Sequence, residues 1–134
     1  MAPRKRNEPR WITRNALGAI HSAQLREHGG SPIARDEGLL ESALARPRQM
    51  WIYDNAADVS VLAAAYAFGL LKNHLFIDGN KGAAFTTAYS FLGLNGHGFD
   101  AAEPDVVTTM ELAASGQISE AKLAEWFRAG ILDP

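Results

Sequence analysis

The sequence predicts an all-α fold, a six-helix bundle with a short extended flap near residues 47–57. Helix-capping residues followed by apolar side chains at helical spacing recur along the whole chain, whereas the alternating pattern of half-buried strands does not. Two nearly all-apolar stretches, residues 59–71 and 82–94, indicate helices at the centre of the fold rather than on its surface. A polar loop joins these two stretches.

Capping residues set the limits of the expected helices. Thr13 can cap the first helix, Asp58 the third and Ser119 the sixth, because each side-chain oxygen can accept a hydrogen bond from the first turn. The second helix is expected to stop before Pro47, since proline lacks a backbone N–H, and the segment that follows it would form the flap. In the second helix, the side chains expected to face inward are Leu39, Leu40 and Leu44. The six expected helices cover about residues 14–28, 36–45, 59–73, 80–94, 104–115 and 120–131.

The composition is that of an ordinary globular domain, with 134 residues, of which 47% are apolar and 21% charged. The absence of cysteine excludes a disulfide framework, a zinc–thiolate site and a thiol nucleophile, and the cytoplasm is the default compartment. The apolar stretch at 59–71 is too short for a membrane span, and residues 82–99, although uncharged, are interrupted by polar side chains and glycines. We therefore expect no membrane-spanning helix and no secretory signal.

The N-terminus is basic, whereas the rest of the chain is acidic. The first ten residues carry a net charge of +3 and the remaining 124 carry −5. The charged residues of this arm are Arg4, Lys5, Arg6 and Arg10, against Glu8. A basic arm can contact nucleic acid, but so few charges without interleaved aromatic residues are typical of a solvated terminus. We expect residues 1–10 to form a disordered arm without direct nucleic-acid contact, and residues 11–134 to form one domain.

The loop between the two central helices carries the residues best suited to binding a ligand or to catalysis. It reads His-Leu-Phe-Ile-Asp-Gly-Asn-Lys-Gly over residues 74–82. The N–H groups of the first turn of the following helix favour an anion, Gly79 and Gly82 allow close approach of a phosphate, and Lys81 adds a positive charge. Asp78 can offer an oxygen ligand to Mg²⁺, and His74 can accept a proton near neutral pH.

These residues also have purely structural interpretations. A lone histidine such as His74 is more often structural than catalytic, and Asp-Gly-Asn is a common turn in which Asp78 or Asn80 would cap the helix. Lys81, however, opposes the helix dipole unless an anion is present. The residues alone leave a phosphate site and a structural turn as open alternatives.

The pattern His74-x-Phe76-x-Asp78-Gly79-Asn80-Lys81 resembles the signature loop of the Fic/Doc family, which continues with arginine. Lysine before that arginine is typical of the Doc branch, whereas Fic members that transfer AMP have glycine there and a second arginine three residues further on. This chain has Phe85 at that second place. The similarity covers about residues 11–130 and includes Gly29-Gly30, residues 90–96 and the turn at 115–119.

The resemblance implies a toxin of a toxin–antitoxin pair. Doc (death-on-curing) toxins use ATP and Mg²⁺ to phosphorylate a threonine of elongation factor Tu, which halts translation. Their antitoxins lay a C-terminal segment into a groove beside the active site. Carried over to this chain, the resemblance gives catalytic roles to His74, Asp78 and Lys81, with Asp78 also holding the metal. The expected phosphate-binding residues are Gly79, Asn80, Lys81, Gly82 and Lys72.

One residue departs from the family pattern, because Gly82 stands where the motif has arginine. Glycine cannot provide the bidentate grip and fixed charge of arginine on a phosphate. The chain is then an attenuated variant, which we favour, a degenerate member that catalyses poorly, or one in which Lys72 or Arg35 supplies the cation. The alternative functions are AMP transfer, as in Fic proteins, and a catalytically inactive module that binds the antitoxin.

Overall fold

A computed structural model describes residues 7–30, 36–72 and 79–132. Within these ranges the chain forms six helices and no β-strand, with a single isolated antiparallel bridge between Phe99 and Ile131. The helices are α1 (Arg14–His28), α2 (Glu37–Tyr53), α3 (Val59–Lys72), α4 (Asn80–Leu94), α5 (Glu103–Ala114) and α6 (Glu120–Gly130). The predicted all-α fold with six helices is confirmed.

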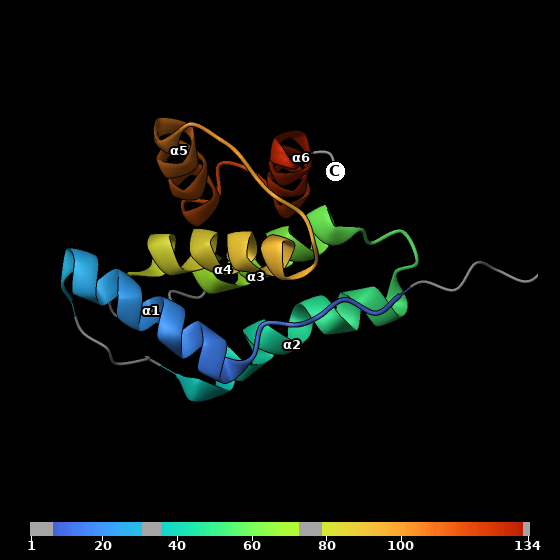
Figure 1. Ribbon diagram of the computed structural model, residues 1–134, viewed down its shortest axis with the longest axis horizontal. Coiled ribbons are helices and arrows are strands. Elements are labelled where there is room, and N and C mark those ends of the chain that lie inside the picture. Colours follow the sequence, from blue (N-terminus) through green and yellow to red (C-terminus); the bar gives the residue numbers. More distant parts are fainter. Residues whose placement is uncertain (1–6, 31–35, 73–78, 133–134) are drawn as a thin grey trace, which may run out of the picture.

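The helices form three layers, with α3 and α4 in the middle, α1 and α2 on one side, and α5 and α6 on the other (Figure 1). Helix α3 contacts α2, α4, α5 and α6, and ten of its fourteen residues are buried. This central position explains why apolar residues occur on all sides of α3. In the described part of the chain, no helix has the length and apolar character needed to cross a membrane.

Side-chain caps start four of the helices. The expected caps at Thr13, Asp58 and Ser119 each accept a hydrogen bond from the backbone N–H three residues on, at 3.0–3.1 Å. Asp36 does the same at the start of α2. Asp58 also pairs with Arg128 of α6, so one carboxylate both caps α3 and ties it to the outer layer.

The prediction of a flap near residues 47–57 is wrong, because α2 continues through Pro47 to Tyr53. Proline removes one backbone hydrogen bond from a helix, but Pro47 is buried, and Met50 and Trp51 beyond it pack against the core. The Trp51 ring also meets the edge of Trp11, with 6.3 Å between ring centroids. Packing of this second half of α2 therefore outweighs the local preference to stop at proline.

Leu39 was also expected to face inward but is 43% exposed, whereas Leu40 is fully buried and Leu44 packs against the core. Two consecutive positions point about 100° apart around a helix, so only one of the pair could face α3.

The segment before α1 is fastened to the central layer. The backbone N–H of Ile12 donates to the hydroxyl of Tyr66 at 3.0 Å, and the Trp11 ring stacks on Phe91. Arg10 exchanges two hydrogen bonds with Asn95 at the end of α4. Residues 1–6 of the basic arm lie outside the described residues.

Replacing Tyr66 by phenylalanine should destabilise the fold by about 1–3 kcal/mol, because the buried N–H of Ile12 loses its acceptor. Urea unfolding followed by circular dichroism measures the change. Tyr53→Phe is the matched control, since Tyr53 is 86% exposed and its loss should change stability by less than about 0.5 kcal/mol. Equal stability of the two variants would show that the hydrogen bond to Ile12 contributes little.

The same tyrosine should make stability depend on alkaline pH. Burial raises the pKa of the Tyr66 hydroxyl above its usual 10.0, against lowering by the hydrogen bond from Ile12 and by Arg48. A pKa raised in the folded state gives stability that is present below about pH 10 and is lost as pH rises toward the folded pKa. The parent should therefore lose more stability than Tyr66→Phe above pH 10. A parallel decline of the two proteins would contradict this.

Candidate phosphate-binding site

The predicted loop ends at the N-terminus of α4, where Gly79 is the capping residue. Its backbone is left-handed, with φ 79° and ψ 16°, which glycine adopts at no steric cost. The cap is therefore neither Asp78 nor Asn80, since Asn80 is the first helical residue. Because Gly79 has no side chain, it offers the first turn of α4 no side-chain oxygen of the kind that caps α1, α2, α3 and α6.

The charge at this helix end is positive. The first turn of α4 contains Lys81 and no acidic residue, whereas the first turns of α2, α5 and α6 all contain acidic side chains. The Lys81 charge therefore adds to the positive end of the α4 dipole instead of offsetting it. A bound anion would reverse this mutual repulsion, so the arrangement is suited to a phosphate group.

Helix α1 packs directly on the first turn of α4. Buried His21 lies behind the cap, and a Cβ atom added at Gly79 would be 3.4 Å from its Cδ2 atom. One turn further along α1, the side-chain amide of Gln24 lies against Gly82 and donates to the hydroxyl of Thr86 at 3.2 Å. We did not anticipate either contact from the sequence. The sequence signal that could have indicated these contacts is the spacing of His21 and Gln24, which are three residues apart and therefore share one face of α1.

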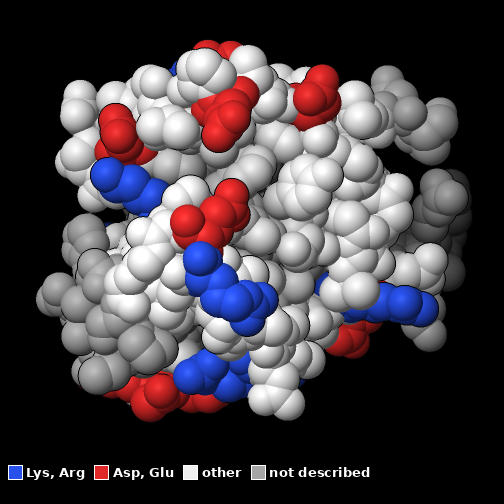
Figure 2. Space-filling model, turned by 60° about the vertical axis from the view of Figure 1, so that its left-hand side comes forward, with Lys and Arg blue, Asp and Glu red and all other residues white. Residues whose placement is uncertain are grey.

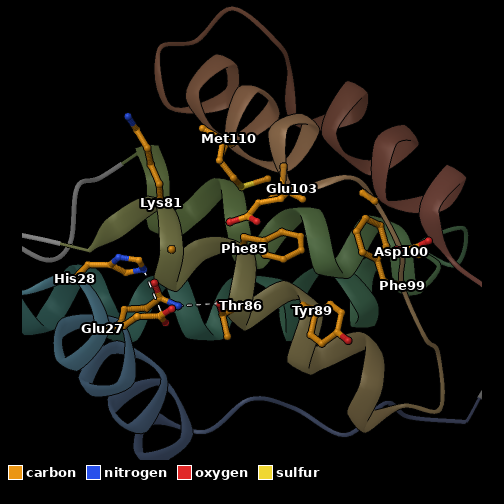
Figure 3. A pocket seen from close by; sticks show the side chains of 15 residues that line it. Glu27, His28, Lys81, Phe85, Thr86, Tyr89, Phe99, Asp100, Glu103 and Met110 are labelled. Atoms are coloured by element: carbon orange, nitrogen blue, oxygen red, sulfur yellow. Dashed lines mark hydrogen bonds and ion pairs between the residues drawn. The ribbon is translucent and has the colours of Figure 1, made fainter.

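A groove of about 600 Å³ begins at this turn and runs along α4 (Figure 3). Lys81 lies at one end, the aromatic side chains of Phe85 and Tyr89 lie along the α4 side, and Met110 faces them from α5. The acidic residues that line it are Glu27, Asp100 and Glu103. The groove thus has Lys81 and the start of α4 at one end, where Glu27 and His28 of α1 also lie, and an apolar surface with Asp100 and Glu103 further along (Figure 3).

The surrounding surface carries mixed charge. Figure 2 views the end of the molecule where α1 finishes and α4 begins, and it shows acidic and basic side chains next to one another at several places, with uncharged surface between these mixed groups. Lys81 is the one lysine or arginine among the described residues that line the groove. The positive charge at the start of α4 is therefore a local feature of the groove.

The structure brings together four of the predicted phosphate-binding residues, Gly79, Asn80, Lys81 and Gly82, at the start of α4. Lys72 is exposed at the end of α3, with its ammonium 5.8 Å from the centroid of the Phe68 ring, and it does not line the groove. The predicted catalytic residues His74 and Asp78, and the alternative cation Arg35, lie outside the described residues.

Within residues 7–30, 36–72 and 79–132, no three histidine or acidic side chains are close enough to hold a metal ion. The assignment of Asp78 as a Mg²⁺ ligand therefore stays a prediction. The glycine cap and the adjacent lysine fit the phosphates of a nucleotide, because both favour close approach of negative oxygen atoms.

Gly79→Ala should destabilise the fold by about 1–2 kcal/mol, because alanine resists the left-handed backbone and its methyl group would touch His21. Gly93→Ala is the control within the same helix, since an added Cβ there meets no atom within 4 Å and should leave stability unchanged or slightly higher. Denaturant unfolding measures both. If Gly79→Ala proves as stable as Gly93→Ala, position 79 does not require glycine.

Comparison with known proteins identifies the family to which the chain belongs. A family model described as Fic/DOC family matches residues 11–92. A protein kinase doc from Escherichia phage P1 is 32% identical over 120 residues, which cover 89% of this chain and 94% of that relative. A toxin Doc from Mycolicibacterium smegmatis is 43% identical over 70 residues, about half of each chain, with 51% of this one and 53% of the relative covered. The chain therefore belongs to the Fic/Doc family, as a Doc-type member.

Proposed function

We propose that this protein is a Doc-type toxin that transfers phosphate from ATP to a threonine of elongation factor Tu in the cytoplasm and so inhibits translation. The observation that carries the proposal is the start of α4, where a glycine cap and Lys81 create a positive site at the mouth of a groove. The names of the two relatives, a protein kinase and a toxin, support the same activity.

In this proposal the first turn of α4 grips the phosphates of ATP. Backbone N–H groups of the first turn point along the helix axis toward its N-terminal end, and Gly79 places no side chain at the cap, so phosphate oxygens can approach. Lys81 neutralises charge on the same phosphates, while Asn80 offers its side-chain amide. Lys72, at the end of α3, would contribute only from outside the groove.

The roles of His74 and Asp78 rest on the family resemblance. The His74 imidazole would take the proton of the threonine hydroxyl as that oxygen bonds to the γ-phosphorus. The bond from the γ-phosphorus to the bridging oxygen breaks, and ADP leaves. Mg²⁺, when bound, would neutralise charge on the phosphates, and Asp78 is the residue that would hold it.

Gly82 should make this activity weak. Removing one group that stabilises transition-state charge typically costs about 10²–10³ in rate. No other arginine or lysine among the described groove-lining residues accompanies Lys81. We therefore infer that the chain is an attenuated Doc-type toxin rather than a fully active one.

AMP transfer is the weaker enzyme alternative. Fic members that transfer AMP have a second arginine at the position of Phe85, and here that ring packs among aromatic residues of the core. It lies 5.9 Å from Phe99 and 6.5 Å from Phe127, measured between ring centroids. This environment favours the Doc branch, because a cationic side chain would replace an aromatic contact with the core.

The decisive test of the chemistry compares the protein with its Gly82→Arg variant, each incubated with elongation factor Tu and Mg-ATP. Intact mass spectrometry of the factor should show a phosphoryl-sized increase, appearing about 10²–10³ times faster with Gly82→Arg. His74→Ala in the Gly82→Arg background is the control and should abolish the increase. An AMP-sized increase would move the protein to the Fic type, and no increase with either protein would favour an inactive antitoxin-binding module.

We further propose that the groove along α4 receives a segment of the antitoxin. Its aromatic and aliphatic floor suits the apolar face of an amphipathic segment, and Glu27, Asp100 and Glu103 suit basic residues on the rim of that segment. Because the groove starts at Lys81 and Gly82, a bound segment would lie beside the nucleotide phosphates. The antitoxin would then inhibit the toxin by occupying the end of the groove beside the phosphate-binding site.

The groove predicts which surface substitutions weaken antitoxin binding. Val107→Asp should reduce affinity for the antitoxin at least about tenfold, because Val107 is 51% exposed and lines the groove. Ile52→Asp is the matched control, since Ile52 is 55% exposed on α2 and does not line the groove. Calorimetric titration with the cognate antitoxin measures both. Stronger loss from Ile52→Asp would place the antitoxin on a different face.

A further inference from the structure

Gln24 of α1 reaches across to α4 and covers Gly82. Its Nε2 atom donates to the Thr86 hydroxyl at 3.2 Å, and Thr86 lies one turn beyond Gly82 on α4. This hydrogen bond holds the carboxamide over the glycine. A Cβ atom at position 82 would be 2.7 Å from the Gln24 Cδ atom and would overlap its Oε1 atom. Carbon atoms pack at about 3.5–4.0 Å, so a side chain at 82 and Gln24 in this position exclude one another.

The backbone does not require glycine at position 82. Gly82 lies within the helical residues of α4, and it is not among the glycines with positive φ, which include Gly79. Glycine inside a helix is intrinsically less stable than alanine. The structural reason for glycine at this position is therefore that the Gln24 side chain occupies the space that a Cβ atom would need.

Residues 24 and 82 also share the mouth of the groove. Gln24, Lys81, Gly82 and Thr86 all line it, so the Gln24 amide lies beside the positive end of α4. A cationic side chain at 82 would need to leave the helix through the space that the amide fills. It could do so only by displacing Gln24 and breaking the hydrogen bond to Thr86.

We propose that Gln24 and Gly82 form a coupled pair, in which the Gln24 amide is a positioning group that opposes entry of a position-82 side chain into the phosphate-binding site and must be displaced before such a side chain can reach it. The activity of the site is then governed by two positions, one on α1 and one on α4. This inference rests on the proposed function in one respect, namely that the site beside Gly82 receives the phosphates of ATP.

The pairing itself is tested by thermal unfolding, without nucleotide. In the parent, Gly82→Ala should leave the Tm unchanged or lower it, because the methyl group meets Gln24. In a Gln24→Ala background the same change should raise the Tm by about 2–4 °C, because only the helix preference for alanine remains. Equal shifts in the two backgrounds would overturn the pairing. Gly93→Ala, where an added Cβ meets nothing, should shift the Tm equally in both.

The functional consequence is tested by Mg-ATP binding to Gly82→Arg with and without Gln24→Ala. The double variant should bind Mg-ATP about three- to tenfold more tightly than Gly82→Arg, because arginine no longer has to break the Gln24–Thr86 hydrogen bond. If Gln24→Ala changed the affinity for Mg-ATP by the same factor in the parent and in Gly82→Arg, the inference would be overturned. Coupled Tm shifts without Mg-ATP binding in any variant would support the pairing and overturn the proposed nucleotide site.

Discussion

The first turn of α4 receives no side-chain oxygen from its own cap, because the capping residue is Gly79. This constraint determines the character of the whole site. The left-handed backbone of Gly79 turns the chain into α4, and the buried side chain of His21 packs behind it. Lys81 then adds positive charge at a helix end that is already positive. A phosphate ligand would offset the positive charge and would accept hydrogen bonds from the uncapped N–H groups of this turn.

The layered packing explains how a polar turn can be positioned within a small apolar fold. Helix α4 lies in the central layer, where α1 covers its first turn and α5 faces its other side across the groove. Phe85 belongs both to the groove and to the aromatic cluster with Phe99 and Phe127. A ligand or peptide in the groove would therefore rest on a part of α4 that is fixed by the core. Phosphate binding and partner binding would share one rigid helix.

Much of this arrangement follows from the sequence, because local rules and tertiary packing agree over most of the chain. The caps at Thr13, Asp58 and Ser119 were predictable, since capping depends on residues only three positions apart. The course of α2 beyond Pro47 was not, because packing of the partly buried Met50 and Trp51 against the core overrides the local signal.

The same distinction holds for the site. Gly79, Asn80 and Lys81 were recognisable as a group because they are adjacent in sequence and resemble a family loop, from which the following Gly82 departs. Gln24 escaped prediction, since its contact with Thr86 joins residues 62 positions apart and depends on how α1 docks on α4. The sequence alone shows glycine at position 82 only as the replacement of the arginine in the family pattern. The structure adds a physical partner for that change on another helix.

The central claim is that the start of α4 binds the phosphates of a nucleotide, and titration of the ¹⁵N-labelled protein with Mg-ATP tests it most directly. The account predicts saturable chemical-shift changes that are largest for the backbone amides of residues 80–83, where the first turn of α4 faces the loop. Inorganic triphosphate should shift the same amides, because the phosphates and not the base are the ligand there. Saturable changes confined to other helices, with these four amides unmoved, would contradict the account.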